Sequence, residues 1–501
     1  MNDPLHRADE TPVLGSYAPS ATETHISLLF GFGDRMFKLK KPVRLSILDW
    51  RDRAARERAC HREVELNRRL SPDVYLGVID VWRDGAMVDH LVEMRRMPAS
   101  RRLAHLLGDG VDVSTELTEL AGLVARFHAT ARRSTAISAR ATVEAVGARW
   151  DELLRVVRAH AGPSTEPGML DEVVVERIAE LSSGYLAGRR ALFASRISSG
   201  LIVDGHGDLM AEDIFLLEDG PRVLDCIEFS DELRSVDVLD DVCTLAMDLE
   251  RFGSAALAAH FLGAYAEASG EHHPSSLADH WIAYRAMVRA DVACTRADQG
   301  AAHAPADLAE AQMLLDVARR HLERARVRLV VVSGLPGTGK STVANALGAS
   351  TKWSVVHSDL VRKELFGLAP DCSAVDALGA YAYSPATTTR TYEMMLACAA
   401  DHLSMGESVV LDATWRDPHW RSRVEAVARA GHAELVVLEC VAPDDVTEMR
   451  LTRRPDTVGS DATVDVARAM ARHAECWPGA VVLDTTKPLD ITLTRAMDAL
   501  D

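Results

Sequence analysis

The alternation of apolar and polar residues changes character once along the chain. Segments THISLLF (24–30) and RMFKLKKPV (35–43) alternate with a period of two, which predicts a hairpin turning at 31–34 within a sheet-rich region. Apolar-periodic stretches predict helices over about 100–200 and about 237–326, with short strands between them. From Val327 onward strands alternate with helices, which predicts a parallel sheet covered by helices on both faces.

These patterns predict two domains that meet near residue 325. A chain of 501 residues is too long for one ordinary core. Residues 1–325 are expected to form an α+β domain, with a sheet-rich lobe at about 20–98 and a helix-rich lobe at about 99–325. Residues 326–501 are expected to form an α/β domain with a parallel sheet.

Composition narrows the classes of function. The net charge of −18 argues against a general nucleic-acid binder, because a polyanion needs a basic face. No apolar run has the length of a membrane span, and the N-terminus shows no signal peptide. Eight Cys without a C-x-x-C pair indicate reduced thiols in a cytoplasmic protein. Only seven of the 56 basic residues are Lys, three of them at positions 38, 40 and 41.

The most specific motif is GLPGTGKST (334–342), a phosphate-binding loop between a predicted strand and a predicted helix. Its glycines allow the backbone N–H groups to face phosphate oxygens, Lys340 reaches the β- and γ-phosphates, and Ser341 offers a hydroxyl to Mg²⁺. The motif predicts these nucleotide-binding residues: Gly334, Gly337, Gly339, Lys340, Ser341 and Thr342.

Three further stretches carry candidate chemistry. Asp412 ends the strand VVLDAT and is expected to hold Mg²⁺ or its water shell, with a helix N-cap or turn as the alternative. Asp359 in HSDLVRKEL can accept a proton from a substrate hydroxyl or orient it, and an N-cap is again the alternative. Arg450, Arg453 and Arg454 can close over the phosphates as a lid, or can simply be solvated.

On GLPGTGKST, SDLVRKEL, VVLDAT and this Arg-rich segment, residues 325–501 resemble the small P-loop kinases of the gluconate kinase, polynucleotide kinase and zeta-toxin type. The resemblance implies transfer of the γ-phosphate of ATP to a small hydroxyl compound or to a nucleic-acid end. It does not choose between these acceptors.

A second phosphate-transfer pattern lies upstream, in HGDLMAEDIF (206–215) and VLDCIEF (223–229). Kinase catalytic loops carry a basic residue or His, an Asp, and a metal-binding Asn five positions later; here Asp208 and Asp213 have that spacing. Asp225 then stands where a second Mg²⁺ ligand belongs. Lys38 and Lys40 share one face of a predicted strand, and Glu63 on the next helix can pair with such a lysine.

These motifs make residues 20–325 resemble the aminoglycoside phosphotransferase branch of the protein-kinase-like fold. More closely, they resemble a bacterial family that joins such a bilobal domain to a P-loop kinase domain. The resemblance implies Asp208 as catalytic base or hydroxyl-orienting group, Asp225 as the main Mg²⁺ ligand, and Lys38 on the ATP phosphates with Glu63 as its partner. Lys40 remains an alternative to Lys38. Asp213 would be a metal ligand in the position usual for Asn, and Asp237 and Asp241 would brace the loop.

The sequence therefore predicts an ATP- and Mg²⁺-dependent phosphotransferase with two nucleotide sites and small-molecule hydroxyl acceptors. One alternative is an ATP-binding regulator with a degenerate site, which Asp213 and Met210 favour slightly. Another is a nucleic-acid-end kinase in the C-terminal half, against which the acidic balance counts. Arg285 and Arg289, four apart on a predicted helix, can meet an anionic acceptor, but surface solvation is the preferred reading.

Overall fold

The computed structural model describes residues 20–23, 26–45, 48–163, 168–300, 303–369, 379–453 and 477–500. Within it the chain forms two compact units, residues 1–141 with 200–272 and residues 142–199 with 273–501. The expected boundary near residue 325 lies inside the second unit, so the division into domains 1–325 and 326–501 stays a prediction.

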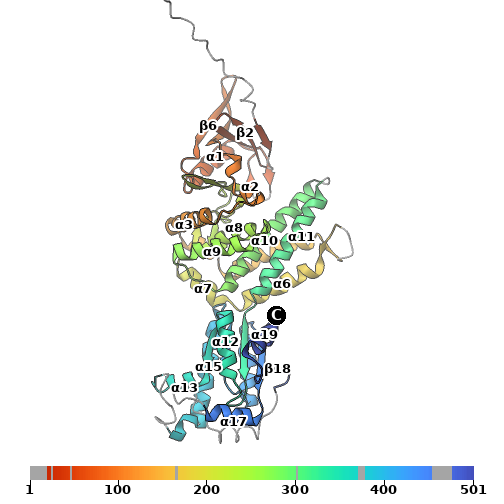
Figure 1. Ribbon diagram of the computed structural model, residues 1–501. Helices are drawn as coiled ribbons and strands as arrows, with labels where there is room; N and C mark the ends of the chain where they lie inside the picture. Colours follow the sequence, from red (N-terminus) through yellow and green to blue (C-terminus); the bar gives the residue numbers. More distant parts are fainter. Residues whose placement is uncertain are drawn as a thin grey trace, which may run out of the picture. The chain divides into compact units, whose positions relative to one another are not determined.

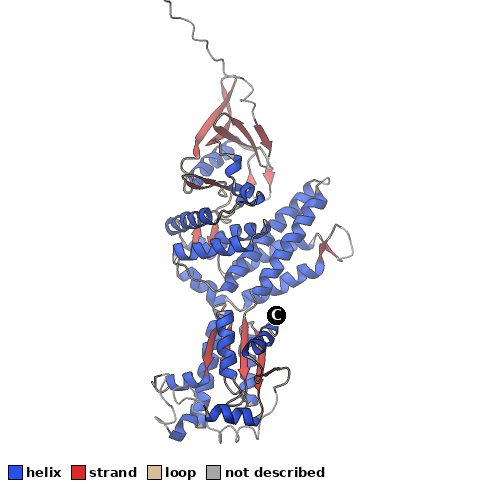
Figure 2. Cartoon of the chain, in the orientation of Figure 1, coloured by secondary structure: helices blue, strands red, loops and turns tan. Residues whose placement is uncertain are grey.

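The first unit begins with an antiparallel sheet, which has five strands among the described residues (Figures 1 and 2). Strands β2 and β3 pair as the predicted hairpin, and Gly33 adopts a positive φ of 59° at its turn. In sheet order the strands are β1 (Ser20–Glu23), β2 (Ser27–Phe32), β3 (Arg35–Lys40), β7 (Ala86–Arg95) and β6 (Tyr75–Arg83).

Helix α1 (Arg53–Asn67) packs on this sheet and follows a small hairpin of β4 (Arg44–Leu45) and β5 (Leu48–Asp49). Cys60 and Val64 on its inner face contact a cluster that includes Tyr75, Val92 and Met94. Glu63 lies next to these apolar residues and is fully buried. The helix thus carries a carboxylate into the space between itself and the sheet, where a buried charge needs a partner.

The rest of the first unit contains two short antiparallel strand pairs. Strand β10 (Ile202–Asp204) pairs with β13 (Ser235–Asp237), and β11 (Ile214–Leu217) pairs with β12 (Gly220–Val223). The loop after β10 carries His206 and Asp208, whereas the loop after β12 carries Asp225. The helices of this part are α2 (Leu103–Gly108), α3 (Ser114–Thr130), α4 (Thr135–Ala139), α8 (Val238–Arg251) and α9 (Ala255–Ser269).

The second unit joins a helical region to a parallel sheet. The helices before the sheet are α5 (Val143–Arg158), α6 (Glu172–Ala187), α7 (Arg190–Ser198), α10 (Ser275–Gln299) and α11 (Ala304–Arg324), with the strand pair β8 (Ala161–Gly162) and β9 (Leu170–Asp171) between α5 and α6. Across the described part of the chain, none of the helices has the length and apolar character needed to cross a membrane.

The sheet of this unit has the predicted strand–helix alternation, and its described strands all pair in parallel. Among the described residues its order is β15 (Ser354–His357), β16 (Val409–Asp412), β14 (Arg328–Ser333), β17 (Glu434–Val441) and β18 (Val481–Asp484). The helices around it are α12 (Lys340–Thr351), α13 (Ser358–Glu364), α15 (Pro385–Ser404), α16 (Pro418–Ala430), α17 (Asp444–Thr452) and α19 (Leu489–Asp498).

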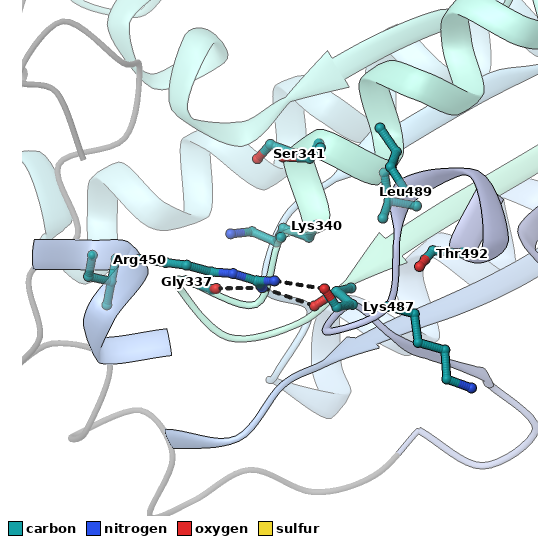
Figure 3. A pocket seen from close by; sticks show the side chains of 12 residues that line it. Gly337, Lys340, Ser341, Arg450, Lys487, Leu489 and Thr492 are labelled. Carbon is teal, nitrogen blue, oxygen red and sulfur yellow. Dashed lines mark hydrogen bonds between the residues drawn. The ribbon is translucent and has the colours of Figure 1, made fainter. Parts of the chain in front are cut away.

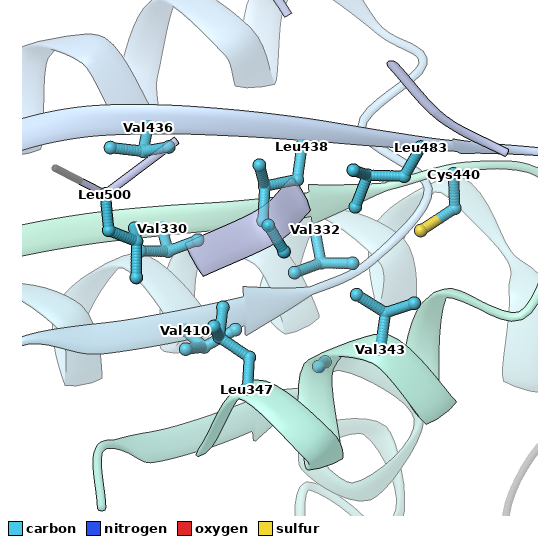
Figure 4. Packing of buried hydrophobic residues seen from close by; sticks show 12 residues of the cluster. Val330, Val332, Val343, Leu347, Val410, Val436, Leu438, Cys440, Leu483 and Leu500 are labelled. Atoms are coloured by element: carbon cyan, nitrogen blue, oxygen red, sulfur yellow. The ribbon is translucent and has the colours of Figure 1, made fainter. Parts of the chain in front are cut away.

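Helices cover both faces of this sheet. Val330 and Val332 of β14 belong to a cluster with Val343 and Leu347 of α12, and α19 packs against the same helix (Figure 4). Side chains alternate along a strand, so Leu329 and Val331 point to the opposite face, where α15 contacts β14 and β16. Burial on both faces explains the unbroken apolar run of the central strand, at whose end the phosphate loop begins.

Replacement of Leu347 by Ala should destabilise the second unit by about 2–5 kcal/mol, because a fully buried side chain is lost and a cavity remains. The shift of its urea unfolding transition measures this loss. Leu360→Ala is the matched control, since Leu360 is 41% exposed and should change the transition little. Equal shifts for both variants would contradict the packing described.

Candidate active sites

Two lysines and three carboxylates meet between the sheet, α1 and the loop after β12. The Lys38 Nζ donates to Glu63 Oε1 at 2.9 Å and to Asp225 Oδ1 at 2.7 Å. The Lys40 Nζ donates to Glu63 Oε2 at 2.7 Å and to Glu228. Both lysines therefore bond the same glutamate. They differ in the second partner, which for Lys38 is the carboxylate expected to hold metal.

Opposite charges favour the ionised forms of Lys38, Lys40 and Glu63 although these groups are buried. Burial disfavours the ammonium of Lys38, but the carboxylates of Asp225, Glu63 and Glu228 outweigh it and raise the Lys38 pKa well above its usual value. Burial likewise opposes ionisation of Glu63, yet the two ammonium groups lower its pKa. The Lys38 ammonium also lowers the pKa of Asp225, which is half-exposed. Each charge in the cluster thus depends on the others.

The loop 205–208 is held by Asp241 of α8. Its two carboxylate oxygens accept hydrogen bonds from the backbone N–H groups of His206 at 2.7 Å and Gly207 at 2.8 Å. His128 bonds the same carboxylate at 3.0 Å. A Cβ at Gly205 would lie 2.5 Å from Asp241 Oδ2, so this close approach requires glycine. The expected brace is confirmed for Asp241, whereas Asp237 instead caps α8 by accepting from the N–H of Leu239.

The His206 ring is buried within the same loop. Its Nε2 bonds the carbonyl oxygen of Leu224 at 3.1 Å, and its Nδ1 lies 3.4 Å from the backbone N of Asp208. Burial lowers the pKa of His206, which favours a neutral ring with the proton on Nε2. The histidine therefore links the loop after β10 to the segment that leads to Asp225.

Asp208, Asp213 and Asp225 act on one another electrostatically. Burial raises the pKa of Asp213 well above its usual value, and the charges of Asp225 and Asp208 raise it further. Asp225 has a positive φ of 61°, a strained backbone conformation of the kind that is often found at functional sites. The carboxylate oxygens are of the type that Mg²⁺ prefers, and a cation would relieve their repulsion.

Residues 334–339 of the motif form the loop between β14 and α12, and Lys340, Ser341 and Thr342 begin the helix. Gly334 has a φ of 145°, and a Cβ there would lie 2.7 Å from the carbonyl oxygen of Cys440. Gly339, with a φ of 85°, is the N-cap of α12. The backbone therefore curls as a phosphate loop must, directly before the N-terminus of a twelve-residue helix.

A cavity of about 440 Å³ opens at this loop (Figure 3). Among the described residues Lys340 has no ion-pair partner, so its ammonium remains available to phosphate. Arg450 of α17 donates to the carbonyl oxygens of Thr485 at 2.7 Å and Gly337 at 3.4 Å. The residues that line this cavity are Gly337, Gly339, Lys340, Ser341, Thr342, Val343, Arg450, Leu451, Thr485, Lys487, Leu489 and Thr492.

The three predicted lid arginines thus differ in their places. Arg450 lines the cavity and is anchored to the phosphate loop, which disfavours simple solvation. Arg453 is exposed at the end of α17. Arg454 lies outside the described residues.

Asp412 ends β16 and is only 3% exposed. Its Oδ2 lies 2.7 Å from Nδ1 of His357, the residue paired with it in the neighbouring strand β15. Its Oδ1 is buried and has no hydrogen-bond partner among the described residues. An orphaned carboxylate oxygen at the end of this strand fits a ligand of Mg²⁺ or of its water shell, as Ser341 does on the cavity wall. Sequence reasoning missed His357, because its partner Asp412 lies 55 positions away along the chain.

In the part of the chain that the structure describes, no three or more His, Cys, Asp or Glu side chains form a metal-binding group. Mg²⁺ sites of kinases typically use one or two carboxylates and complete their shell with phosphate oxygens and water. Asp213 and Asp225 at the first site, and Asp412 at the phosphate loop, fit that pattern.

Asp359 lies in the first turn of α13, whose N-cap is His357, so the N-cap alternative for Asp359 is wrong. Its Oδ1 accepts from Arg362 at 2.5 Å, and the Arg362 guanidinium lies 4.5 Å from the ring centroid of Tyr383. Arg285 also differs from expectation: it is 6% exposed rather than solvated, because α10 is buried along most of its length.

Several known proteins are similar to parts of this chain. The family described as "AAA domain" matches residues 329–476. A gluconokinase from Sinorhizobium meliloti is 19% identical, with a TM-score of 0.25, over 34% of this chain and 91% of its own. A choline/ethanolamine kinase family protein from Mesorhizobium loti is 15% identical, with a TM-score of 0.35, over 62% of this chain and 94% of its own. The predicted fold class, an α+β part followed by an α/β part with a parallel sheet, is confirmed by the two five-stranded sheets among the described residues.

A relative along the whole length is "Uncharacterized protein Rv2004c" from Mycobacterium tuberculosis (strain ATCC 25618 / H37Rv). It is 40% identical over 493 residues, which are 97% of this chain and 96% of the relative. The chain therefore belongs to the family of this mycobacterial protein.

Proposed function

We propose that the protein is an ATP-dependent phosphotransferase with two nucleotide sites, each transferring the γ-phosphate to a hydroxyl group of a small molecule. The observation that carries the proposal is the cavity at the phosphate loop. Lys340 and Ser341 line it, and the ammonium of Lys340 has no ion-pair partner among the described residues. Such a loop is built to hold phosphates, because its N–H groups, its lysine and the helix N-terminus all favour negative charge.

In the P-loop part, Lys340 would contact the β- and γ-phosphates, with Gly334, Gly337, Gly339 and Thr342 shaping and completing the loop. Ser341 and Asp412 would hold Mg²⁺, which bridges phosphate oxygens and neutralises their charge when bound. Asp359 would accept the proton of the acceptor hydroxyl or orient that group. Arg450 would add positive charge beside the transferred phosphate, and Arg454 is proposed as a further lid arginine.

In the protein-kinase-like part, Asp208 would orient or deprotonate the acceptor hydroxyl. Lys38 is the better placed of the two lysines to contact ATP phosphates, because it already bonds Asp225, the proposed main Mg²⁺ ligand. Glu63 would fix Lys38 in position. Asp213 would be the second Mg²⁺ ligand.

A second candidate function is regulatory, with ATP held at the protein-kinase-like site but not turned over. The crowding of Asp213 with Asp208 and Asp225 favours it, because burial and these two charges raise the pKa of Asp213 and so oppose its ionisation as a metal ligand. Both candidates require nucleotide binding at this site. They differ in whether ADP is released.

Lys340→Met should reduce the binding of a non-hydrolysable ATP analogue with Mg²⁺ from two molecules per chain to one, because the phosphate loop loses its cation. Isothermal titration calorimetry counts the sites. Lys352→Met at the other end of α12 is the matched control and should still bind two. A wild-type stoichiometry of one, or unchanged binding by Lys340→Met, would contradict the two-site proposal.

Lys38→Met and Lys40→Met should fail in different ways. Loss of Lys38 should lower the rate of ADP release at this site on the order of 10²-fold, because loss of one donor to the reacting phosphate typically has this effect. Its effect on the thermal unfolding temperature should be smaller than that of losing Lys40. Loss of Lys40 leaves Glu228 without its ammonium partner, and breaking a buried pair costs about 3–5 kcal/mol of stability.

ADP release and thermal unfolding of both variants test this difference, with Lys41→Met as control. Lys41 pairs with Glu23, a carboxylate that is 69% exposed, so its loss should alter neither quantity much. If Lys40→Met lowers turnover without loss of stability, then Lys40 and not Lys38 is the phosphate contact.

Asp213→Asn should keep ADP release within about tenfold of the parent chain and should raise the Mg²⁺ concentration needed for half-maximal rate, because a neutral oxygen replaces a charged ligand. The measurement uses the Lys340→Met background, so that only the protein-kinase-like site contributes. Asp219→Asn, on the loop between β11 and β12, is the control. Turnover that is absent in the parent and appears in Asp213→Asn would instead support the regulatory candidate.

A further inference from the structure

A second cavity lies in the second unit, away from the residues that line the phosphate loop. Its volume is about 340 Å³, and its walls come from α6, the end of α11, the segment between α11 and β14, and the turn that leads into β17. The residues that matter for its chemistry are Gly184, Tyr185, Arg189, Arg326, His432 and Glu434. None of them lines the phosphate-loop cavity.

Arg189 is the unusual member of this set. Its side chain is 1% exposed, and its Nη1 donates to the backbone carbonyl oxygens of Gly188 at 2.9 Å and Gly431 at 2.8 Å. Its Nε is buried without a hydrogen-bond partner. Among the residues that the structure describes, no carboxylate pairs with it. Its other close neighbour is the ring of Tyr185, whose centroid lies 5.5 Å from the guanidinium carbon.

The neighbouring charges are already balanced among themselves. Arg177 pairs with Glu323 at 2.8 Å and with Glu180 at 2.7 Å. Glu434 pairs with Arg326 at 2.6 Å and with Arg328 at 3.1 Å. These three arginines and three glutamates leave the charge of Arg189 uncompensated.

Two glycines make the position of Arg189 possible. A Cβ at Gly188 would lie 2.4 Å from the carbonyl oxygen of Gly431, so the segment before α7 closes on the turn before β17 only without a side chain there. The turn is entered at Gly431, and the next residue, His432, has a positive φ of 45°. The backbone thus brings the guanidinium to the cavity wall at a fixed place.

A buried guanidinium on a cavity wall, without a carboxylate partner, favours the binding of an anion. Burial lowers the pKa of Arg189, but a guanidinium starts from so high a pKa that it stays charged. Carbonyl oxygens and an aromatic ring compensate a full charge only in part, and buried charges are ordinarily paired. The cavity volume is at the small end of the range for ligand pockets. We propose that this cavity binds a small oxyanion-bearing ligand, a phosphate or a carboxylate, through Arg189.

The test is calorimetric titration of inorganic phosphate, and separately of succinate, into the full chain saturated with a non-hydrolysable ATP analogue and Mg²⁺. Saturation blocks the two proposed nucleotide sites, so that remaining phosphate binding reports on other sites. Binding of phosphate but not succinate identifies a phosphate ligand, and the reverse identifies a carboxylate. Either result supports the proposal if the variants below respond as expected.

Arg189→Met should weaken binding of the preferred probe about tenfold or more, because a charge-assisted hydrogen bond is removed. Arg190→Met is its control, since Arg190 is an exposed neighbour that pairs with Glu144. Gly184→Leu is a second variant, which leaves Arg189 in place and fills the cavity. A Cβ at Gly184 meets no atom within 4 Å, so the helix accepts the change.

Gly263→Leu on α9 is the control for this second variant, because a Cβ there also meets no atom within 4 Å. Loss of binding in both cavity variants with retention in both controls is the expected result. If Arg189→Met does not fold, Gly184→Leu against Gly263→Leu decides alone. The proposal is overturned if the saturated wild type binds neither probe, or if the cavity variants that fold bind like the wild type.

Discussion

Glu63 bonds Lys38 and Lys40 at once, and this shared pairing joins α1 to strand β3 of the sheet. The carboxylate reaches the cluster from α1, the lysines from β3, and Asp225 and Glu228 from the loop after β12. The side chains of Lys38, Lys40, Glu63 and Glu228 are buried, and a buried charge without a partner costs several kcal/mol, so these four groups depend on one another. Correct packing of α1 on the sheet is therefore a condition for presenting Lys38 and Asp225 to a nucleotide.

The two candidate sites differ in whether their phosphate-binding lysine is already paired with carboxylates. At the phosphate loop, Lys340 has no ion-pair partner among the described residues, and Asp412 keeps one oxygen unbonded. In the protein-kinase-like site, Lys38 is already neutralised by Glu63 and Asp225. Nucleotide and metal would add to an open site in the first case. In the second they would have to replace or share the Lys38–Asp225 bond, which makes this site the more sensitive to the extra charge of Asp213.

The sequence predicted what depends on local pattern. The hairpin of β2 and β3 follows from period-two alternation, and the parallel sheet follows from strand–helix alternation around the glycine-rich motif. The gathering of Lys38, Glu63 and Asp225 was predictable because kinase-like sites have a known order of elements. Glu228, His357 and Arg189 were not predictable in the same way, because their roles arise from partners far away in sequence, namely Lys40, Asp412 and the carbonyl oxygen of Gly431. Periodicity contains no information on such pairs.

The scarcity of lysine in this chain gains a physical meaning from these contacts. Lys40 fits between two carboxylates with its Nζ 4.4 Å from the centroid of the Trp50 ring, and Lys38 likewise bridges two carboxylates. A compact ammonium can bond groups in several directions from one point, whereas a planar guanidinium is suited to side-on pairing with one carboxylate. Arg234, fully buried, needs Asp204, Asp231 and two carbonyl oxygens to satisfy its larger fork. Arginine would therefore not fit the shared Glu63 geometry, and lysine is required there by shape as well as by charge.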